Sequence, residues 1–425
     1  MMKNILVLAY AVSPTRGSEF SVAWNYIVHM SKNNHLVVLY GVSDEHLGEM
    51  SEMQEYLKRN TIRNVKFVGV ETNKKIEIFN FLNRKGIFNY TFYLAFNEWQ
   101  KLAFKKAKKI IKEEHIDLIH CLGPIGYREP GYLWKLDKPY IWGPISGFNN
   151  VPINMLDVLP IMDKIKLGFR YLVNSFQMYF NRRVRKAIKR TDVLLAATSE
   201  NGAIIKKIFE KDTPIITENA IHTKIEFVNI DKFSSNTINL IWIGRIDGGK
   251  SLIIALKALT KIHKRDIILN VVGDGPLKEK MQEFSKKMGI DDLIKWHGKV
   301  PRSKVYELLT KSHLHLITSV SEGNPTTIWE AMSVGVPTLS LDHCGMHDVL
   351  CDRCGIKIPI ASLDKIVADL TFEIDRIQDD KNSLYELALG TIDCAQKYRW
   401  SERIKFWEDM YDLAIENHAG KNKHS

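Results

Sequence analysis

The stretch that decides the fold is Ser319-Val-Ser-Glu-Gly-Asn-Pro-Thr-Thr-Ile-Trp-Glu-Ala-Met-Ser-Val-Gly-Val-Pro337. The segment His313 to Val320 is rich in apolar residues and predicts a buried strand. A turn at residues 323–325 interrupts this strand. Thr326 and Thr327 are good N-cap residues for a helix from Thr327 to Val334. The pattern is strand, turn and helix, which is typical of an α/β protein.

Two carboxylates, Glu322 and Glu330, flank this turn. The N-terminus of a helix binds anions, and carboxylates accept hydrogen bonds from hydroxyl groups. A nucleotide sugar needs both features, because it carries a diphosphate and several hydroxyl groups. From this window alone, an ordinary strand–turn–helix with one surface glutamate and one helix-face glutamate is an equally good interpretation.

The length and composition favour a two-domain globular protein. The chain has 425 residues, of which 45% are hydrophobic and 26% charged, and a single core seldom covers that length. No apolar run reaches the ~20 residues of a membrane span. The run Ile5 to Val12 resembles a short signal peptide with an A-x-A site at residues 9–11, but it fits better as the first strand of an α/β domain. The expected location is the cytoplasm.

Strands and helices alternate twice along the chain. In the first half we expect strands at 4–12, 35–40, 64–70, 116–120, 139–142, 192–197 and 214–217, with helices at 22–32 and 103–114. In the second half we expect strands at 238–243, 267–272, 293–297, 313–320, 337–341 and 355–358, with helices at 252–263 and 327–334. Such alternation predicts parallel sheets covered by helices on both faces.

The predicted organisation is an α/β fold with two Rossmann-like domains. The N-terminal domain covers 1–222, a polar linker covers 223–236, the C-terminal domain covers 237–399, and a final helix and tail cover 400–425. This helix is expected to dock across the domain boundary. Ligands bind at the carboxyl ends of parallel strands, so in the first domain the loops 13–19, 121–129 and 143–150 are the informative ones.

The excess of positive over negative charge is confined to the first half. Residues 1–222 contain 32 Lys and Arg against 21 Asp and Glu, whereas residues 223–425 contain 28 of each. Much of the excess lies in residues 182–190, after the apolar segment 169–180. A basic amphipathic segment indicates contact with an anionic membrane or a polyphosphate, although a solvated helix face is as good an interpretation. No nucleic-acid-binding motif is present, so nucleic acid is not an expected partner.

The five cysteines are Cys121, Cys344, Cys351, Cys354 and Cys394. An odd number at scattered spacing argues against a disulfide framework and for a reducing compartment. Cys351-x-x-Cys354 and Cys344, with a histidine at 343 or 347, suggest zinc. Small buried thiols around the strand at 355–358 are the favoured interpretation, so no metal site is predicted.

Residues 244–251 fit the P-loop pattern G-x-x-x-x-G-K-[ST] between a strand and a helix. A P-loop NTPase is therefore a rival. However, the segment lies behind a complete α/β domain, and no convincing strand follows that ends in a magnesium-binding aspartate. A P-loop also has no need of the carboxylates at 322 and 330. In both interpretations Lys250 is a cation that reaches diphosphate oxygens.

These motifs together resemble the retaining glycosyltransferases of family 4, which have the GT-B fold of two domains facing each other across a cleft. The resemblance is carried by Gly244-Arg245 with Lys250, by Gly273-Asp274-Gly275-Pro276 and by Glu322-x7-Glu330-Ala-Met. It covers nearly the whole chain. The motifs at 16–19, 124–131 and 142–144 resemble a bacterial branch that makes surface polysaccharides.

The resemblance implies a role for each matching residue. Arg245 and Lys250 neutralise the donor diphosphate as the nucleotide leaves, Glu330 binds the ribose hydroxyls, and Glu322 contacts the donor sugar. The backbone around Asn324, Pro325, Thr326 and Thr327 holds a phosphate, Gly244 belongs to the diphosphate loop, and Gly17 lets the N-terminal loop approach the donor. No D-x-D motif occurs in the sequence, so no obligatory metal or other cofactor is expected.

One departure from the family concerns His120, which stands where members often carry an H-x-H motif. His120 either contacts the donor sugar or caps its strand. Arg128 and Glu129 are candidates for binding the acceptor, which a basic N-terminal domain would receive as a glycan or a lipid-diphosphate-linked glycan at the inner membrane face. A GT-B protein that binds sugar nucleotides without catalysis is a further alternative. The sequence does not specify the donor base, the sugar, the acceptor or the linkage.

Overall fold

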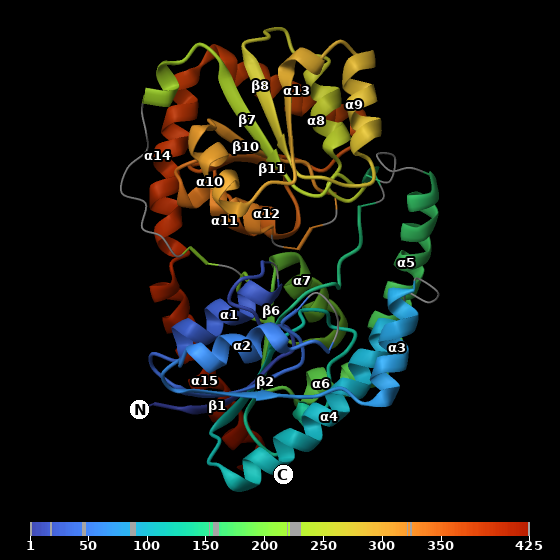
Figure 1. Ribbon diagram of the computed structural model, residues 1–425, viewed down its shortest axis with the longest axis vertical. Coiled ribbons are helices and arrows are strands. Elements are labelled where there is room, and N and C mark those ends of the chain that lie inside the picture. Colours follow the sequence, from blue (N-terminus) through green and yellow to red (C-terminus); the bar gives the residue numbers. More distant parts are fainter. Residues whose placement is uncertain are drawn as a thin grey trace. The chain divides into compact units, whose positions relative to one another are not determined.

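The computed structural model describes residues 2–17, 19–44, 48–85, 91–152, 154–155, 161–218, 220–221, 231–320, 322–323 and 325–423. The chain forms two compact units. Unit 1 comprises Met1–Asn149, Phe176–Glu218 and Arg403–Ser425, and unit 2 comprises Asn150–Ser175 and Asn219–Glu402. Each unit is a parallel sheet with helices packed against it (Figure 1).

Unit 1 contains a six-stranded sheet in the order β3-β2-β1-β4-β5-β6. Its strands are β1 (Asn4–Ala9), β2 (His35–Tyr40), β3 (Val65–Gly69), β4 (Leu118–Gly123), β5 (Tyr140–Ile145) and β6 (Val193–Ala196). Its helices are α1 (Glu19–Met30), α2 (Ser51–Arg59), α3 (Lys74–Arg84), α4 (Thr91–Glu113), α6 (Arg182–Arg190) and α7 (Ser199–Phe209). Helix α5 (Ile161–Phe180) ends in unit 1, and so does α15 (Trp400–Lys423).

Unit 2 repeats this arrangement with the strand order β12-β11-β10-β7-β8-β9. Its strands are β7 (Ile238–Ile243), β8 (Ile267–Val272), β9 (Ile294–Gly298), β10 (Leu314–Ile317), β11 (Thr338–Leu341) and β12 (Gly355–Ile358). Its helices are α8 (Leu252–Leu259), α9 (Lys278–Lys287), α10 (Arg302–Lys311), α11 (Thr326–Ser333), α12 (Cys344–Val349), α13 (Leu363–Asp379) and α14 (Lys381–Lys397).

The strand sequences explain why helices cover both faces of each sheet. Central strands such as β7 (INLIWI) and β8 (IILNVV) are nearly continuous runs of apolar residues. Such runs must be buried on both sides, as in parallel α/β sheets. Leu240, Leu269 and Leu314 are fully buried in the core of unit 2, and Leu6, Ile119 and Ile145 are fully buried in that of unit 1.

Most predicted elements are present, and four strands match residue for residue: β2, β7, β8 and β12. The predicted strand at 214–217 is wrong, because only Ile215 forms a single bridge, to Ala196, and Pro214 has no N–H to donate. The helix predicted at 103–114 begins twelve residues earlier, at Thr91. The predicted helix at 327–334 begins at Thr326, with Pro325 as its N-cap.

The division into units differs from the predicted domain boundaries at residues 150–175. This segment groups with unit 2 although it precedes β6 in the chain. The reason is Met155, which is fully buried in the core cluster of unit 2, with Val151 and Leu167 packed against the same cluster. At the other end, α15 returns to unit 1 from Arg403 onward.

Both sheets have a switch point, where the first and fourth strands lie side by side and the crossover connections run in opposite directions. In unit 1 the two strands are β1 and β4, and in unit 2 they are β7 and β10. Open α/β sheets bind ligands at the carboxyl ends of these two strands. The loops after β1, β4, β7 and β10 are therefore the places where a site is expected.

Candidate functional site

In unit 2 the switch point holds an ion pair between two of the predicted site residues. Lys250 lies in the loop after β7 and Glu322 in the loop after β10, and the Lys250 ammonium contacts the Glu322 carboxylate. The lysine side chain is 27% exposed and the glutamate side chain 16%. Both charges are therefore partly withdrawn from water but remain accessible to a ligand.

Backbone hydrogen bonds fix these two loops against each other. The Val320 N–H donates to the Gly249 carbonyl at 2.9 Å, and the Thr318 hydroxyl donates to the Lys250 carbonyl at 3.1 Å. The Trp242 indole N–H in turn donates to the Thr318 hydroxyl at 3.1 Å. The Lys250–Glu322 pair is thus set by main-chain geometry and by a buried tryptophan.

The loop after β8 joins the loop after β7 at a very close backbone approach. Gly273 has φ +139°, and a Cβ on it would lie 1.8 Å from the Gly244 carbonyl oxygen. A Cβ on Gly275 would lie 2.5 Å from the Ile246 carbonyl oxygen. Only glycine fits such positions, which explains the Gly-Asp-Gly-Pro motif physically.

Helix α11 begins beside Glu322, with Pro325 as its N-cap and no side-chain cap. The first N–H groups of a helix have no partner within the helix, and the helix dipole makes this end attractive to anions. Thr326 and Thr327 form its first turn. Asn324, which belonged to the same prediction, lies outside the described residues.

Glu330 lies one turn further along α11 and pairs with Arg302, the first residue of α10, at 3.0 Å. Its side chain is only 13% exposed. Burial raises the pKa of the Glu330 carboxyl, and Arg302 opposes this shift. This partner of a candidate site residue could not be predicted from the sequence, because nothing near Arg302 in the chain distinguishes it from other surface arginines.

Arg245 behaves differently from Lys250. Its side chain is 71% exposed, and its guanidinium lies 3.6 Å from Asp247 in the same loop. An exposed pair of this kind contributes little to stability. Arg245 therefore contributes little to the stability of its loop, and most of its side chain is open to solvent.

His120 lies in the core of unit 1. It is fully buried, because β4 continues to Gly123 and His120 is an interior strand residue rather than a terminal one. Its Nδ1 lies 2.9 Å from the Tyr26 hydroxyl and its Nε2 lies 2.9 Å from the Gly143 carbonyl oxygen. Burial lowers the pKa of His120 to about 4. With no exposed atom, His120 cannot touch a substrate in this structure.

The two acceptor candidates, Arg128 and Glu129, are also engaged in unit 1. Arg128 donates to Gln177 at 2.9 Å and lies over the ring of Tyr127. Glu129 contacts Arg183 and accepts a hydrogen bond from Asn97 at 3.0 Å. Burial raises the pKa of Glu129, and Arg183 opposes this shift.

The loop after β1 carries Gly17, where an added Cβ would meet nothing within 4 Å. The glycine is therefore not required by packing. At this switch point a cavity of about 20 Å³ is lined by Tyr10, Glu19, Leu122 and Pro124 among others. It has room for about one water molecule.

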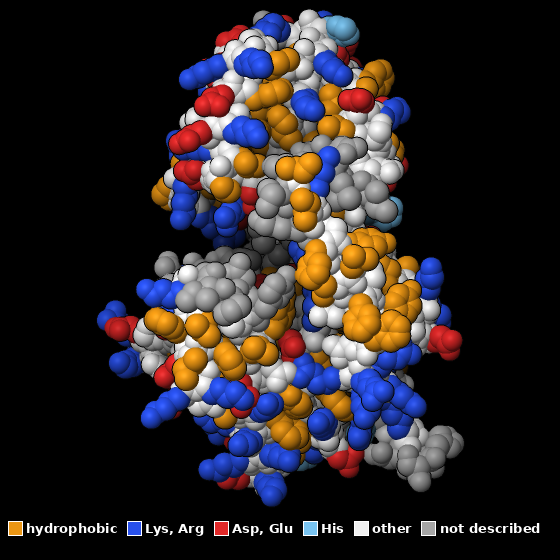
Figure 2. Space-filling view, turned by 90° about the vertical axis from the view of Figure 1, so that its right-hand side faces the viewer, with side chains coloured by type: hydrophobic (Ala, Val, Ile, Leu, Met, Phe, Trp, Pro, Cys, Tyr) orange, Lys and Arg blue, Asp and Glu red, His pale blue; other side chains and the backbone are white. Residues whose placement is uncertain are grey.

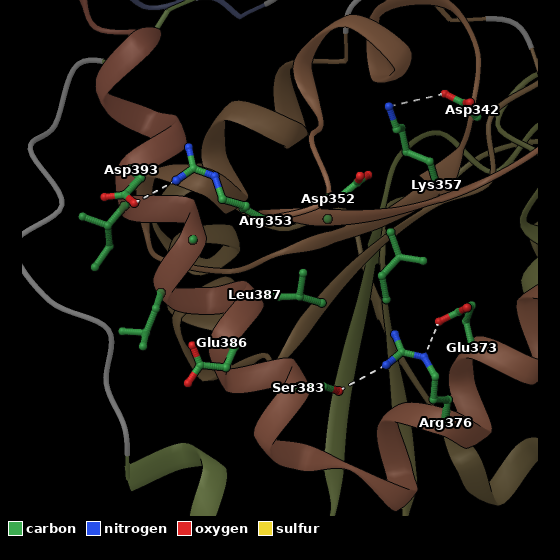
Figure 3. Close-up of a pocket in the computed structure, with 15 residues that line it drawn as sticks. Asp342, Asp352, Arg353, Lys357, Glu373, Arg376, Ser383, Glu386, Leu387 and Asp393 are labelled. Carbon is green, nitrogen blue, oxygen red and sulfur yellow. Dashed lines mark hydrogen bonds and ion pairs between the residues drawn. The ribbon is translucent and has the colours of Figure 1, made fainter.

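A larger cavity of about 1120 Å³ lies elsewhere in unit 2 (Figure 3). It is lined by β12, α13 and α14, and Arg353, Lys357 and Arg376 alternate there with acidic side chains. Arg376 donates to Glu373 at 2.8 Å. None of the predicted site residues that the structure describes lines this cavity, so its size alone does not identify it as the functional site.

Comparison with known families bears on the part of the chain that carries the ion pair. Residues 224–374 match the family described as "Glycosyl transferases group 1". This segment is therefore similar to the glycosyltransferases of group 1. It contains the P-loop-like segment 244–251.

Two of the curated relatives have names that refer to lipopolysaccharide or to colanic acid biosynthesis. Lipopolysaccharide 1,6-galactosyltransferase of Escherichia coli (strain K12) is 34% identical over 128 residues, which is 29% of this chain and 35% of that protein. The putative colanic acid biosynthesis glycosyltransferase WcaL of the same organism is 24% identical over 137 residues, 30% of this chain and 34% of that protein. The chain thus aligns with about a third of the length of these relatives.

Solved structures extend the likeness to the fold of the whole chain. The apo form of lipopolysaccharide outer core galactosyltransferase WaaB has a TM-score of 0.62 at 17% identity, covering 99% of both chains. Anabaena Alr3699/HepE in complex with UDP and glucose has a TM-score of 0.61 at 13% identity, covering 96% of this chain and 99% of that one. The two-unit α/β architecture is the GT-B fold of these glycosyltransferases, as predicted.

Proposed function

We propose that this protein is a retaining glycosyltransferase that moves a hexose-type sugar from a nucleotide-sugar donor to a glycan or lipid-linked glycan. The observation that carries the proposal is the Lys250–Glu322 pair at the switch point of unit 2, within the segment that matches the group 1 glycosyltransferases. Withdrawing two charges from water costs free energy that their mutual attraction does not always offset. A pair held in this position is therefore better explained by ligand binding than by stability. A diphosphate with an attached sugar meets both charges at once.

In this proposal the diphosphate lies between Lys250, Arg245 and the N-terminus of α11. As the bond to the sugar breaks, negative charge grows on the diphosphate, and fixed cations and dipoles stabilise that charge. Glu322 accepts hydrogen bonds from hydroxyls of the donor sugar. Sugar transfer with retention, through an oxocarbenium-like state on one face of the ring, follows from the family resemblance.

Glu330 binds the ribose hydroxyls of the nucleotide. Its pairing with Arg302 at 3.0 Å orients the carboxylate before the donor arrives. A preordered acceptor reduces the entropy lost on binding. Since HepE was solved with UDP and glucose, we propose a UDP-hexose as the donor class.

The acceptor side of the proposal includes an anionic membrane surface. Helix α5 carries exposed apolar side chains at residues 161, 165, 169, 172, 176 and 180, a spacing that places them along one face. The next helix, α6, is strongly basic, with arginines or lysines at 182, 183, 185, 186, 189 and 190. Figure 2 shows hydrophobic side chains gathered beside Lys and Arg on one face. Among the described helices, none is both long and apolar enough to cross a bilayer.

Nucleotide release tests the transfer reaction. The purified protein is incubated with UDP-, GDP-, ADP- and dTDP-hexoses and with ATP, with and without EDTA, in the presence of lipid-linked glycan. We expect UDP release from one UDP-hexose, unaffected by EDTA, and an α-anomeric product by NMR when the donor is α-linked. Release of phosphate from ATP that needs magnesium, with no release from any sugar nucleotide, would overturn the proposal.

Liposome flotation tests the membrane part separately. Wild type should float with vesicles of anionic lipid at low salt and not with zwitterionic vesicles. Phe176→Ser should weaken flotation, whereas Phe372→Ser on α13 is a matched control, because both phenylalanines are 65% exposed. Equal flotation of the two variants would refute the role of α5 and leave the transferase proposal standing.

A further inference from the structure

Three cysteine thiols meet in unit 2, away from the residues assigned to the donor. Cys351 and Cys354 lie in the turn between α12 and β12, and Cys394 lies on α14. The Cys351 sulfur is 2.9 Å from that of Cys394 and 3.6 Å from that of Cys354. All three sulfurs lie within 4.8 Å of one another. Cys344, which the sequence grouped with them, is not part of this cluster.

The turn that carries Cys351 and Cys354 is closed by hydrogen bonds to the Cys351 carbonyl. The N–H groups of Cys354 and Gly355 donate to this carbonyl at 2.9 and 3.1 Å. The turn thus holds two thiols close together, with their sulfurs 3.6 Å apart. The thiolate is the form of cysteine that binds metals.

Helix α14 is shaped to bring the third thiol to this turn. A Cβ on Gly390 would lie 1.7 Å from the Arg353 carbonyl oxygen, so only glycine lets the helix come so close. Cys394 follows Gly390 by four residues, which places both on the same helix face. Outside the cluster, Arg353 pairs with Asp393 at 3.3 Å, as Figure 3 shows.

We propose that Cys351, Cys354 and Cys394 form a three-thiolate site for a thiophilic divalent metal ion, with Zn²⁺ as the expected occupant. Sulfurs around a tetrahedral Zn²⁺, each about 2.3 Å from it, lie about 3.8 Å apart. The 3.6 Å pair already fits this spacing, and the 2.9 Å pair opens by less than about 1 Å. Each thiol loses one proton to solvent as it binds the metal in its thiolate form.

The fourth coordination position faces outward. Within the described part of the chain, the cluster contains three His, Cys, Asp or Glu ligands and no fourth. Cys354 and Cys394 are buried, whereas Cys351 is partly exposed. A water molecule or a small thiol reaching Cys351 from solvent completes the tetrahedron. The site thus has the composition of an open metal site rather than a closed one.

The cluster lies directly behind the helix that carries Glu330. Cys354 and Cys394 belong to the same buried cluster as Trp329 of α11, and Trp329 packs edge-to-face on Tyr398, with ring centroids 4.9 Å apart. A metal that ties α14 to the turn before β12 therefore stiffens the packing beneath α11. This consequence for donor binding rests on the proposed function, whereas the metal site itself does not.

Cobalt binding to the full-length, fully reduced protein tests the site. Co²⁺ should give thiolate-to-metal charge-transfer absorption that saturates at one equivalent and is displaced by Zn²⁺. In Cys394→Ser the affinity for Zn²⁺ should fall at least tenfold, whereas Cys121→Ser, which removes a buried thiol of unit 1, should leave it unchanged. Absence of the charge-transfer band in wild type would overturn the proposal, as would equal Zn²⁺ affinity in both variants.

A second measurement on wild type does not depend on the folding of variants. Zn²⁺ should protect Cys351 from alkylation by iodoacetamide at least tenfold, read by peptide mass spectrometry. Unchanged alkylation of Cys351 would count against the site, and so would a Cys351–Cys394 disulfide that persists under a phosphine reductant. Neither readout uses transferase activity, so failure of the metal site and failure of the proposed function can be told apart.

Discussion

The two sheets of this protein have the same strand order, but the loops at their switch points differ. Each places its first and fourth strands side by side, and each carries a buried histidine on the fourth strand, His120 on β4 and His315 on β10. In unit 1 the loops at this edge close over a cavity of about 20 Å³. In unit 2 they hold the partly buried Lys250–Glu322 pair.

This difference shows that the strand order of a sheet positions a site but does not supply its chemistry. The strands are almost interchangeable in pattern, whereas the loop residues after them are not. Function in α/β proteins is carried by loops on a rigid scaffold. Changes to the loops of unit 2 should therefore alter activity most, and changes to the buried strand residues of unit 1 should mainly alter stability.

The largest effect is expected from Lys250→Ala. Loss of the cation removes stabilisation of the leaving diphosphate, so kcat/KM should fall about 1000-fold, or ~4 kcal/mol. Steady-state kinetics with the preferred sugar nucleotide measures it. Lys261→Ala, an exposed lysine just beyond α8, is the matched control. A loss below tenfold in Lys250→Ala would remove Lys250 from the proposed site.

The two buried histidines offer a stability comparison. His120 uses both ring nitrogens, whereas His315 bonds Thr338 through Nδ1 and its Nε2 has no hydrogen-bond partner among the described residues. His120→Leu leaves the buried Gly143 carbonyl without this hydrogen bond and should lower the free energy of unfolding by about 3 kcal/mol. His315→Leu also removes an unpaired nitrogen, so it should cost about 1 kcal/mol. Urea denaturation measures both, and equal costs would contradict the difference.

His120 also predicts a pH dependence. Burial lowers its pKa to about 4 in the folded state, against about 6.5 when unfolded. The unfolded chain therefore binds the proton more tightly, and the stability that neutral His120 preserves is lost as the pH falls from about 6.5 towards 4. As the pH falls from 7.5 to 5, the gap in unfolding free energy between wild type and His120→Leu should shrink by about 2 kcal/mol. A gap that stays constant with pH would contradict this assignment.

The sequence predicts most strands of the two sheets, because apolar runs and turn residues are local signals. β2, β7 and β8 were located residue for residue. The spacing within two motifs also indicates Lys250 and Glu322 as candidate site residues, but it does not predict that they contact each other. The pairing of Arg302 with Glu330 depends on how α10 packs beside α11, which no local pattern encodes. For the same reason, His120 was taken as a strand-end residue, and Cys394 was not grouped with Cys351.

A smaller effect is expected from Glu330→Gln, which keeps one acceptor oxygen but loses the charge that faces Arg302. The KM for the donor should rise about tenfold, or ~1.4 kcal/mol, with kcat nearly unchanged, because ribose binding is equal in the ground and transition states. Kinetics at saturating acceptor measure this. Glu283→Gln on α9, an exposed glutamate, serves as control. A fall in kcat without a change in KM would assign Glu330 to the chemistry instead.

The smallest effect separates a packing glycine from a ligand-facing glycine. Gly273 cannot accept a Cβ, whereas a Cβ on Gly17 meets nothing within 4 Å. Gly17→Ala should therefore change the free energy of unfolding by less than about 0.5 kcal/mol. The KM of this variant for the donor should nevertheless rise about threefold, because we expect the donor to approach this loop and the added methyl group to occupy space that the donor needs. Stability and donor KM that are both unchanged would show that unit 1 does not use Gly17 to bind the donor, and the contrast between the two switch points would then be complete.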